Sequence, residues 1–354
     1  MQQQTKVKFV NFPLQYKKIK KEIDAAIQDV LNRGDLILRK DVEEFEKTLA
    51  DYVGTKYAIG VNSGTDALAL SVKVLVDPGD EVIVPAHTFF ATIEAVTHRR
   101  AIPVLVDVGP DLLMDMDDVE NHITEKTKAI IPVHLAGSVC NMDKLLKIAM
   151  KYNLTIIEDA AQALGAKRGD KMAGSFGLTG CFSFYPAKML GAYGDAGAIT
   201  TNDWRIANTL RALRNHGGKP ENEFEGFNSR LDNLQAAILN VKFKHLQGAI
   251  ERRAEIAKMY LDGLKGINGL KLPPDTPGRV WQDFIIQNKM DGLYEYLKKR
   301  GIETIIDKYK FPNWYSIPSY TQYIGSTALR LPIAPELTDQ EIKLVINTIK
   351  EFYE

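Results

Sequence analysis

One lysine stands directly after a strand pattern and before a run of glycines. The apolar residues 181–185 predict a buried strand, Pro186 ends it, and Lys188 precedes glycines at 191, 194 and 197. An amine held partly out of water in such a turn has a lowered pKa and can form a Schiff base. Taken alone, Lys188 is better explained as a solvated surface residue, because lysine is mostly exposed.

Two other strand ends carry groups that favour the chemical interpretation. Ser63, Gly64 and Thr65 lie between a strand pattern and a helix pattern, where backbone N–H groups and hydroxyls can bind a phosphate. Asp159 ends the apolar stretch 154–158, where a carboxylate can pair with a protonated ring nitrogen. Ordinary helix capping is the alternative explanation at both places. A lysine, a carboxylate and a phosphate cup together meet the demands of pyridoxal 5'-phosphate, so their joint occurrence predicts that cofactor.

Short apolar strands alternate with helices in the first two thirds of the chain, which predicts parallel βαβ units. We expect one mostly parallel, seven-stranded sheet with helices on both faces, and ligands at the C-terminal ends of its strands. Helices are also expected at 15–33, ending at Gly34, and across 42–52, ending at Gly54. The strands are expected at 57–61, 79–85, 102–107, 128–133, 154–158, 181–185 and 197–201.

The last third of the chain has a different pattern. Helices are expected at 204–215 and 231–244, and the second runs into a long polar helix to about 264. A stretch rich in glycine and proline follows at 266–280. A strand at 284–287 and helices near 291–300 and 338–352 then predict a smaller α+β domain. We therefore expect a large cofactor-binding domain at 1–245, which includes the N-terminal helices, and a small domain at 246–354.

Composition and missing motifs exclude several classes of function. The chain has 354 residues, with 45 basic and 45 acidic side chains, so no net charge draws it to nucleic acid or membranes. Neither a signal-peptide pattern nor a membrane-length apolar run is found, so a cytoplasmic protein is expected. Cys140 and Cys181 lie in separate apolar runs and are interpreted as packing residues. A P-loop, a dinucleotide fingerprint and a close histidine pair are all missing, so no metal is predicted.

The motifs as a set resemble the DegT/DnrJ/EryC1/StrS family of sugar aminotransferases, which has the aspartate aminotransferase fold (type I of the pyridoxal phosphate enzymes). The resemblance implies that Lys188 forms the Schiff base and transfers protons, and that Asp159 pairs with the pyridine nitrogen. The motifs that carry it are SGTDAL (63–68), PGDEVIVPAHTFFAT (78–92), TKAIIPVHL (127–135), IIEDAAQALGA (156–166), CFSFYPAKMLGAYGDAGA (181–198) and GFNSRLDNLQAAIL (226–239).

The same resemblance assigns roles to the remaining site residues. Gln162 would lie near the ring hydroxyl of the cofactor, and Phe89 would stack on the ring, with core packing as the alternative for Phe89. Ser183 would join Gly64 and Thr65 at the phosphate. Asn228 would reach that phosphate from a neighbouring subunit, so the resemblance implies a homodimer with shared active sites.

The implied reaction moves an amino group from L-glutamate, through pyridoxamine phosphate, to a nucleotide-linked keto-sugar, with ping-pong kinetics. The segment 228–232, Asn-Ser-Arg-Leu-Asp, resembles relatives that act at C-3. A C-4 enzyme and a keto-cyclitol aminotransferase remain alternatives. Cofactor-dependent sugar dehydratases of the family carry histidine at the position of Lys188, which argues against that activity. A non-catalytic cofactor-binding protein is the least favoured alternative, because fold alone does not fix function.

Three departures from the family pattern fall on the substrate side. Ala136 stands where relatives usually have tyrosine, Ala334 where they often have histidine, and residues 307–312 differ from the usual segment. His134 and His216 remain candidate substrate-side residues, although a structural role fits histidine better at both positions.

Overall fold

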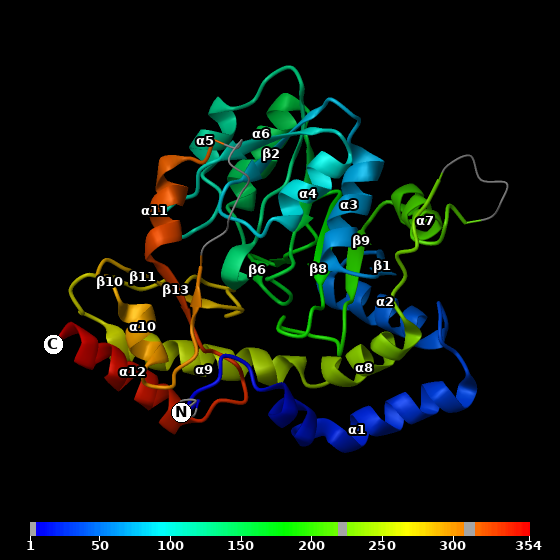
Figure 1. Ribbon diagram of the computed structural model, residues 1–354. Helices are drawn as coiled ribbons and strands as arrows, with labels where there is room; N and C mark the ends of the chain where they lie inside the picture. Colours follow the sequence, from blue (N-terminus) through cyan, green and yellow to red (C-terminus); the bar gives the residue numbers. More distant parts are fainter. Residues whose placement is uncertain (1–4, 219–224, 308–315) are drawn as a thin grey trace.

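The structure is a computed structural model that describes residues 5–218, 225–307 and 316–354 (Figure 1). Its centre is a seven-stranded sheet in the order β1-β9-β8-β5-β4-β2-β3, which confirms the predicted sheet. The strands are β1 (Tyr57–Val61), β2 (Glu81–Pro85), β3 (Ile102–Val106), β4 (Thr127–Ile130), β5 (Thr155–Asp159), β8 (Thr179–Ser183) and β9 (Gly197–Thr201).

Strand β9 is the one antiparallel member of this sheet. It pairs antiparallel with both β8 and β1, whereas the other neighbours pair in parallel. The reason lies in the connection, because a parallel neighbour is usually reached by a crossover that contains a helix. Residues 184–196, which include Lys188, join β8 to β9 without a helix, so the chain doubles back beside β8.

Helices cover both faces of the large sheet. Successive residues of a strand point to opposite faces, and accordingly Phe182 packs in one core with Phe45 of α2 and Leu239 of α8. Its neighbour Cys181 packs in the other core, with residues of α3, α4 and α7. The helices of this part are α1 (Phe12–Arg33), α2 (Lys40–Val53), α3 (Gly64–Leu75), α4 (Ala91–His98), α5 (Met116–Asn121), α6 (Met142–Tyr152), α7 (Trp204–Leu213) and α8 (Asn233–Phe243).

The expected helix ends are found where glycine takes a left-handed conformation. Gly34 (φ 70°) ends α1 and Gly54 (φ 82°) ends α2, each donating its backbone N–H to a carbonyl of the last turn. The helical stretch expected from 231 to 264 is divided, because α8 ends at Phe243 and a separate helix, α9 (Leu246–Leu264), begins three residues later. The two follow one another beneath the large sheet, with α1 alongside α8 (Figure 1).

A second, antiparallel sheet has the order β10-β11-β13-β12 and packs against α9 and α12 through a core that includes Tyr260 and Phe284. Val7, from the N-terminal segment, also belongs to this core, so the proposed division at residue 245 stays a prediction. The remaining elements are β6 (Lys167–Arg168), β7 (Lys171–Met172), β10 (Leu270–Lys271), β11 (Phe284–Asn288), β12 (Ile305–Ile306), β13 (Ala328–Leu331), α10 (Leu293–Lys298), α11 (Ser319–Thr327) and α12 (Asp339–Tyr353).

Within the described ranges, none of the helices combines the length and the apolar character that crossing a membrane requires. The same ranges contain no group of three or more His, Cys, Asp or Glu side chains that could hold a metal ion.

Candidate active site

A cavity of about 560 Å³ lies at the C-terminal ends of the central strands. It collects eight of the nine residues that the sequence singled out, and these come from the ends of β1, β2, β5 and β8 and the segments that follow them. The eight are Ser63, Gly64, Thr65, Phe89, Asp159, Gln162, Ser183 and Lys188. Such a position is where open α/β sheets bind their ligands.

The turn before α3 is built for a close approach to β8. Ser63 does cap the helix, since its Oγ accepts a hydrogen bond from the N–H of Asp66 at 3.0 Å. A Cβ on Gly64 would lie 2.5 Å from the Cβ of Ser183, so only glycine lets the helix N-terminus and Ser183 meet. The result is a concave group of backbone N–H groups and hydroxyls, which suits a phosphate.

Asp159 is a buried carboxylate, 5% exposed, at the floor of the cavity. Burial raises the pKa of this carboxyl group, while hydrogen bonds to its charged form oppose that rise. These bonds come from the hydroxyl of Thr92 at 2.8 Å and from the N–H of Ala161 at 3.1 Å. No α-helix begins after Asp159, so the helix-capping alternative does not apply here.

Thr92 is a site residue for which the sequence analysis proposed no role. Its hydroxyl lies 2.8 Å from Oδ2 of Asp159 and 3.2 Å from the carbonyl of Phe89, and the shorter contact is to the carboxylate. The hydroxyl of Thr88 lies 2.8 Å from the Thr92 oxygen. Thr88 can therefore donate to Thr92 while Thr92 donates to Asp159. The only sequence signal was the position of both residues inside the motif at 78–92.

Lys188 lies in a compact turn that directs it into the cavity. Its N–H donates to the carbonyl of Tyr185 at 2.8 Å, and a Cβ on Gly191 would lie 2.2 Å from the carbonyl oxygen of Pro186. The amine forms no hydrogen bond or ion pair with the described residues, and burial lowers its pKa. A lysine in this state is suited to nucleophilic and proton-transfer chemistry.

Gln162 and Phe89 occupy other parts of the cavity wall. The Oε1 of Gln162 accepts a hydrogen bond from the N–H of Ala136 at 2.8 Å, which leaves its amide nitrogen as a donor for a ligand. Ala136 takes a left-handed conformation (φ 53°) to present that N–H. Phe89 is 62% exposed, so the core-packing alternative for Phe89 is wrong.

Asn228 does not line this cavity. It is exposed, and its backbone forms an isolated bridge with Asn215. Its expected role toward a neighbouring subunit stays a prediction.

The described residues of the cavity wall include neither the candidate histidines nor Ala136, Ala334 or Asp307. His134 is fully buried, with Nε2 2.9 Å from Oε2 of Glu158 and Nδ1 accepting the N–H of Cys140 at 3.2 Å, so its role is structural. Ala334 is buried in the core of the second sheet. His216 takes a left-handed conformation (φ 57°). Of the segment 307–312, residues 308–312 lie outside the described residues.

The second sheet supplies a wall that the sequence analysis did not foresee. Gln282, Asp283, Ile305 and Arg330 all line the cavity, and they come from three separate segments of the C-terminal third. No motif connected them, because they meet only through the pairing of β11, β12 and β13.

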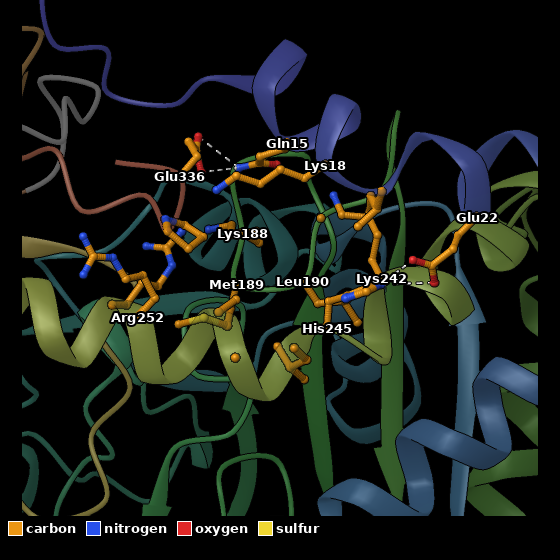
Figure 2. A pocket seen from close by; sticks show the side chains of 17 residues that line it. Gln15, Lys18, Glu22, Lys188, Met189, Leu190, Lys242, His245, Arg252 and Glu336 are labelled. Carbon is orange, nitrogen blue, oxygen red and sulfur yellow. Dashed lines mark hydrogen bonds and ion pairs between the residues drawn. The ribbon is translucent and has the colours of Figure 1, made fainter. Parts of the chain in front are cut away.

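A second cavity, of about 460 Å³, is shown in Figure 2. It is bordered by α1, the start of α9 and residues 188–191. Lys242 lies in its wall, where burial lowers the pKa of this amine to about 8. Of the nine predicted site residues only Lys188 reaches this cavity, so the chemistry belongs to the first one.

The chain is similar in sequence and in structure to known aminotransferases. The DegT/DnrJ/EryC1/StrS aminotransferase family matches residues 17–350. The dTDP-3-amino-3,4,6-trideoxy-alpha-D-glucose transaminase of Streptomyces venezuelae is 40% identical over 369 residues, which span 99% of this chain and 97% of that protein. The X-ray structure of S. venezuelae DesV has a TM-score of 0.94 at 39% identity over 99% of each chain. The structure of NtdA from Bacillus subtilis with bound PMP has a TM-score of 0.90 at 29% identity, over 99% of this chain and 86% of that one.

Proposed function

We propose that this chain, which belongs to the DegT/DnrJ/EryC1/StrS aminotransferase family, aminates C-3 of a nucleotide-linked keto-sugar with L-glutamate as the amino donor. The chain is a transaminase, and its cofactor is pyridoxal phosphate. The observation that carries the proposal is the convergence of Lys188, Asp159 and the turn 63–65 on one cavity.

The residues present fit this cofactor. Pyridoxal phosphate, when bound, supplies an aldehyde that takes up the amino nitrogen and a ring that withdraws electrons. The close contact of Gly64 with Ser183 would form a cup for its phosphate, and Asp159 is the buried carboxylate that would keep its ring nitrogen protonated. Phe89, exposed on the cavity wall, would cover one face of the ring.

Lys188 would move the protons in both half-reactions. Burial lowers the pKa of its amine, which favours the neutral form that can accept a proton and return it. The first half-reaction takes nitrogen from the donor and releases a keto acid, and the second gives nitrogen to the acceptor. Parallel double-reciprocal plots are expected for such a ping-pong scheme, and intersecting lines would contradict it.

The choice of C-3 has two supports. The relative from S. venezuelae is named for a 3-amino sugar, and the segment 228–232 has the residues that the sequence analysis associated with C-3 enzymes. The test is a panel of nucleotide-linked 3-keto and 4-keto sugars, with glutamate as donor and with product mass and NMR as readouts. Amination of the 4-keto members alone would overturn the C-3 proposal and favour the C-4 alternative.

The shared active site of a homodimer is part of the same proposal. Asn228 is exposed and lies outside the cavity of its own subunit, which supports a role in the neighbour's site. Mixing inactive Lys188→Ala and Asn228→Ala proteins tests this, because mixed dimers then contain one intact site. Random reassortment should restore about a quarter of wild-type activity, whereas no recovery would contradict the shared site.

A further inference from the structure

A line of charged contacts crosses from the large sheet to the second sheet at the cavity. Nε2 of His87 lies 3.1 Å from Oδ2 of Asp307, and Oδ1 of Asp307 accepts from Nε of Arg330 at 2.7 Å. Arg330 in turn donates through NH1 to Oδ2 of Asp283 at 3.0 Å. Burial alone would raise the pKa of Asp307, but Arg330 and His87 hold it below its usual value. Two carboxylates thus share one guanidinium group.

Asp283 lies at the end of this line, beside the catalytic lysine. The side chain of the preceding residue, Gln282, donates to the carbonyl of Ala187 at 3.1 Å, which ties the start of β11 to the turn that holds Lys188. Asp283 and Lys188 line the same cavity. The negative charge of Asp283 raises the pKa of the Lys188 amine and so opposes the effect of burial.

One oxygen of Asp283 is left for a ligand. Its side chain is only 6% exposed, and Oδ2 is taken by Arg330. Oδ1 receives no hydrogen bond from the described residues, although the residue faces the cavity. Because Asp283 lines the cavity, this oxygen can exchange solvent for a donor of the ligand, and a site built to hydrogen-bond a hydroxyl group rejects analogues that lack it.

We infer that Oδ1 of Asp283 accepts a hydrogen bond from a hydroxyl group of the sugar acceptor while the ketone of that sugar lies beside Lys188. Arg330 holds the carboxylate in place from the other side, with Asp307 and His87 behind it. Asp283 is thereby a specificity residue, which selects polyhydroxylated ketones over carboxylate-bearing or deoxygenated ones. This inference rests on the proposed function, because it concerns the acceptor of that reaction.

The experiment follows the two half-reactions separately through the absorbance of the bound cofactor. In Asp283→Ala, KM for the keto-sugar should rise about 10- to 100-fold, as expected for loss of a hydrogen bond to a charged group. The glutamate half-reaction, compared at its own pH optimum because Asp283 also raises the pKa of Lys188, should stay within about threefold. Asp283→Asn keeps the shape but makes only neutral hydrogen bonds, so its KM should rise about 3- to 10-fold. Asp291→Asn, an exposed carboxylate beyond the end of β11, is the matched control and should change neither half-reaction.

Deoxygenated acceptors show whether the lost contact is the one proposed. With the wild-type protein, removal of the recognised hydroxyl should raise KM as much as Asp283→Ala does. With Asp283→Ala, the deoxygenated acceptor should be no worse than the parent sugar, because the two changes remove the same bond. Additive losses for every deoxygenated acceptor would overturn the inference.

The other outcomes are also decisive. An unchanged acceptor KM in Asp283→Ala overturns the inference while leaving the proposed function intact. Equal losses in both half-reactions, with a displaced pH profile, would mean that Asp283 acts through Lys188 and not on the acceptor. If the alanine variant fails to bind cofactor or to unfold cooperatively, Asp283→Asn decides by the same criteria. A wild-type protein that aminates no keto-sugar refutes the proposed function itself, and this inference with it.

Discussion

Replacement of Thr92 by valine removes the hydroxyl group that donates to Asp159 in the active site. The hydroxyl of Thr92 donates to Oδ2 of Asp159 at 2.8 Å, and valine keeps the shape without the donor. Hydrogen bonds to charged groups contribute about 1.5–3 kcal/mol, so the pKa of Asp159 should rise by about one to two units. Burial already raises this pKa, and the loss acts in the same direction. Because the proposed role needs the ionised carboxylate, activity should be lost at a higher pH when the solution is acidified.

The measurement is kcat/KM for glutamate from about pH 5 to pH 9, which reports the free enzyme. The acid limb of Thr92→Val should lie about one to two pH units above that of the wild-type protein. Thr88→Val is the matched control, because it removes the hydroxyl next to Thr92 and leaves the bond to Asp159 in place. An unshifted limb in Thr92→Val, or an equal shift in Thr88→Val, would refute the reasoning.

Three further changes have distinct expected results. Lys188→Ala should still bind cofactor yet lose turnover, and retained steady-state activity would contradict the mechanism. Gly64→Ala places a Cβ 2.5 Å from that of Ser183 and should weaken cofactor binding in an absorbance titration at least about tenfold, whereas Gly248→Ala, with open space around it, should not. Lys242→Met should raise Tm near pH 7, because burial lowers the pKa of Lys242 from 10.5 to about 8 and its charged form therefore destabilises the fold. That gain should shrink as the pH rises from about 8 toward 10.5, and an equal gain at all pH values would contradict it.

Local patterns account for the parts of the fold that the sequence predicted. The alternation of short apolar strands and helices identified all seven strands of the large sheet, because buried parallel strands are nearly continuous apolar runs. The left-handed glycines Gly34 and Gly54 ended the first two helices as expected. The two-residue strands β10 and β12 were not predicted, because their pairing depends on β11 and β13 and not on their own composition. The break between α8 and α9 likewise has no glycine or proline to announce it.

The candidate site also contains residues that short sequence patterns predicted and residues that they did not. Residues at the strand ends were predictable, since Ser63 follows a recognisable strand and Asp159 and Ser183 belong to two others, and such residues lie at one edge of a parallel sheet. Thr92 was less visible, because its role depends on the direction of one hydroxyl from the first turn of α4. The second sheet contributes Asp283 and Arg330, which are 47 residues apart in the chain and join through a single ion pair.

The cofactor side and the acceptor side of the cavity therefore differ in how they are built. The cofactor-side residues lie at the ends of four strands of one sheet or in the segments that follow them, so short motifs suffice to find them. Asp283 is placed by tertiary contacts, through Arg330 on one side and through Gln282 and the carbonyl of Ala187 on the other. Residues of the second sheet can change without disturbing the strand ends. The choice of sugar can thus vary while the chemistry at Lys188 is kept. The residues that select the acceptor are therefore to be sought on the second sheet and not in the motifs of the first.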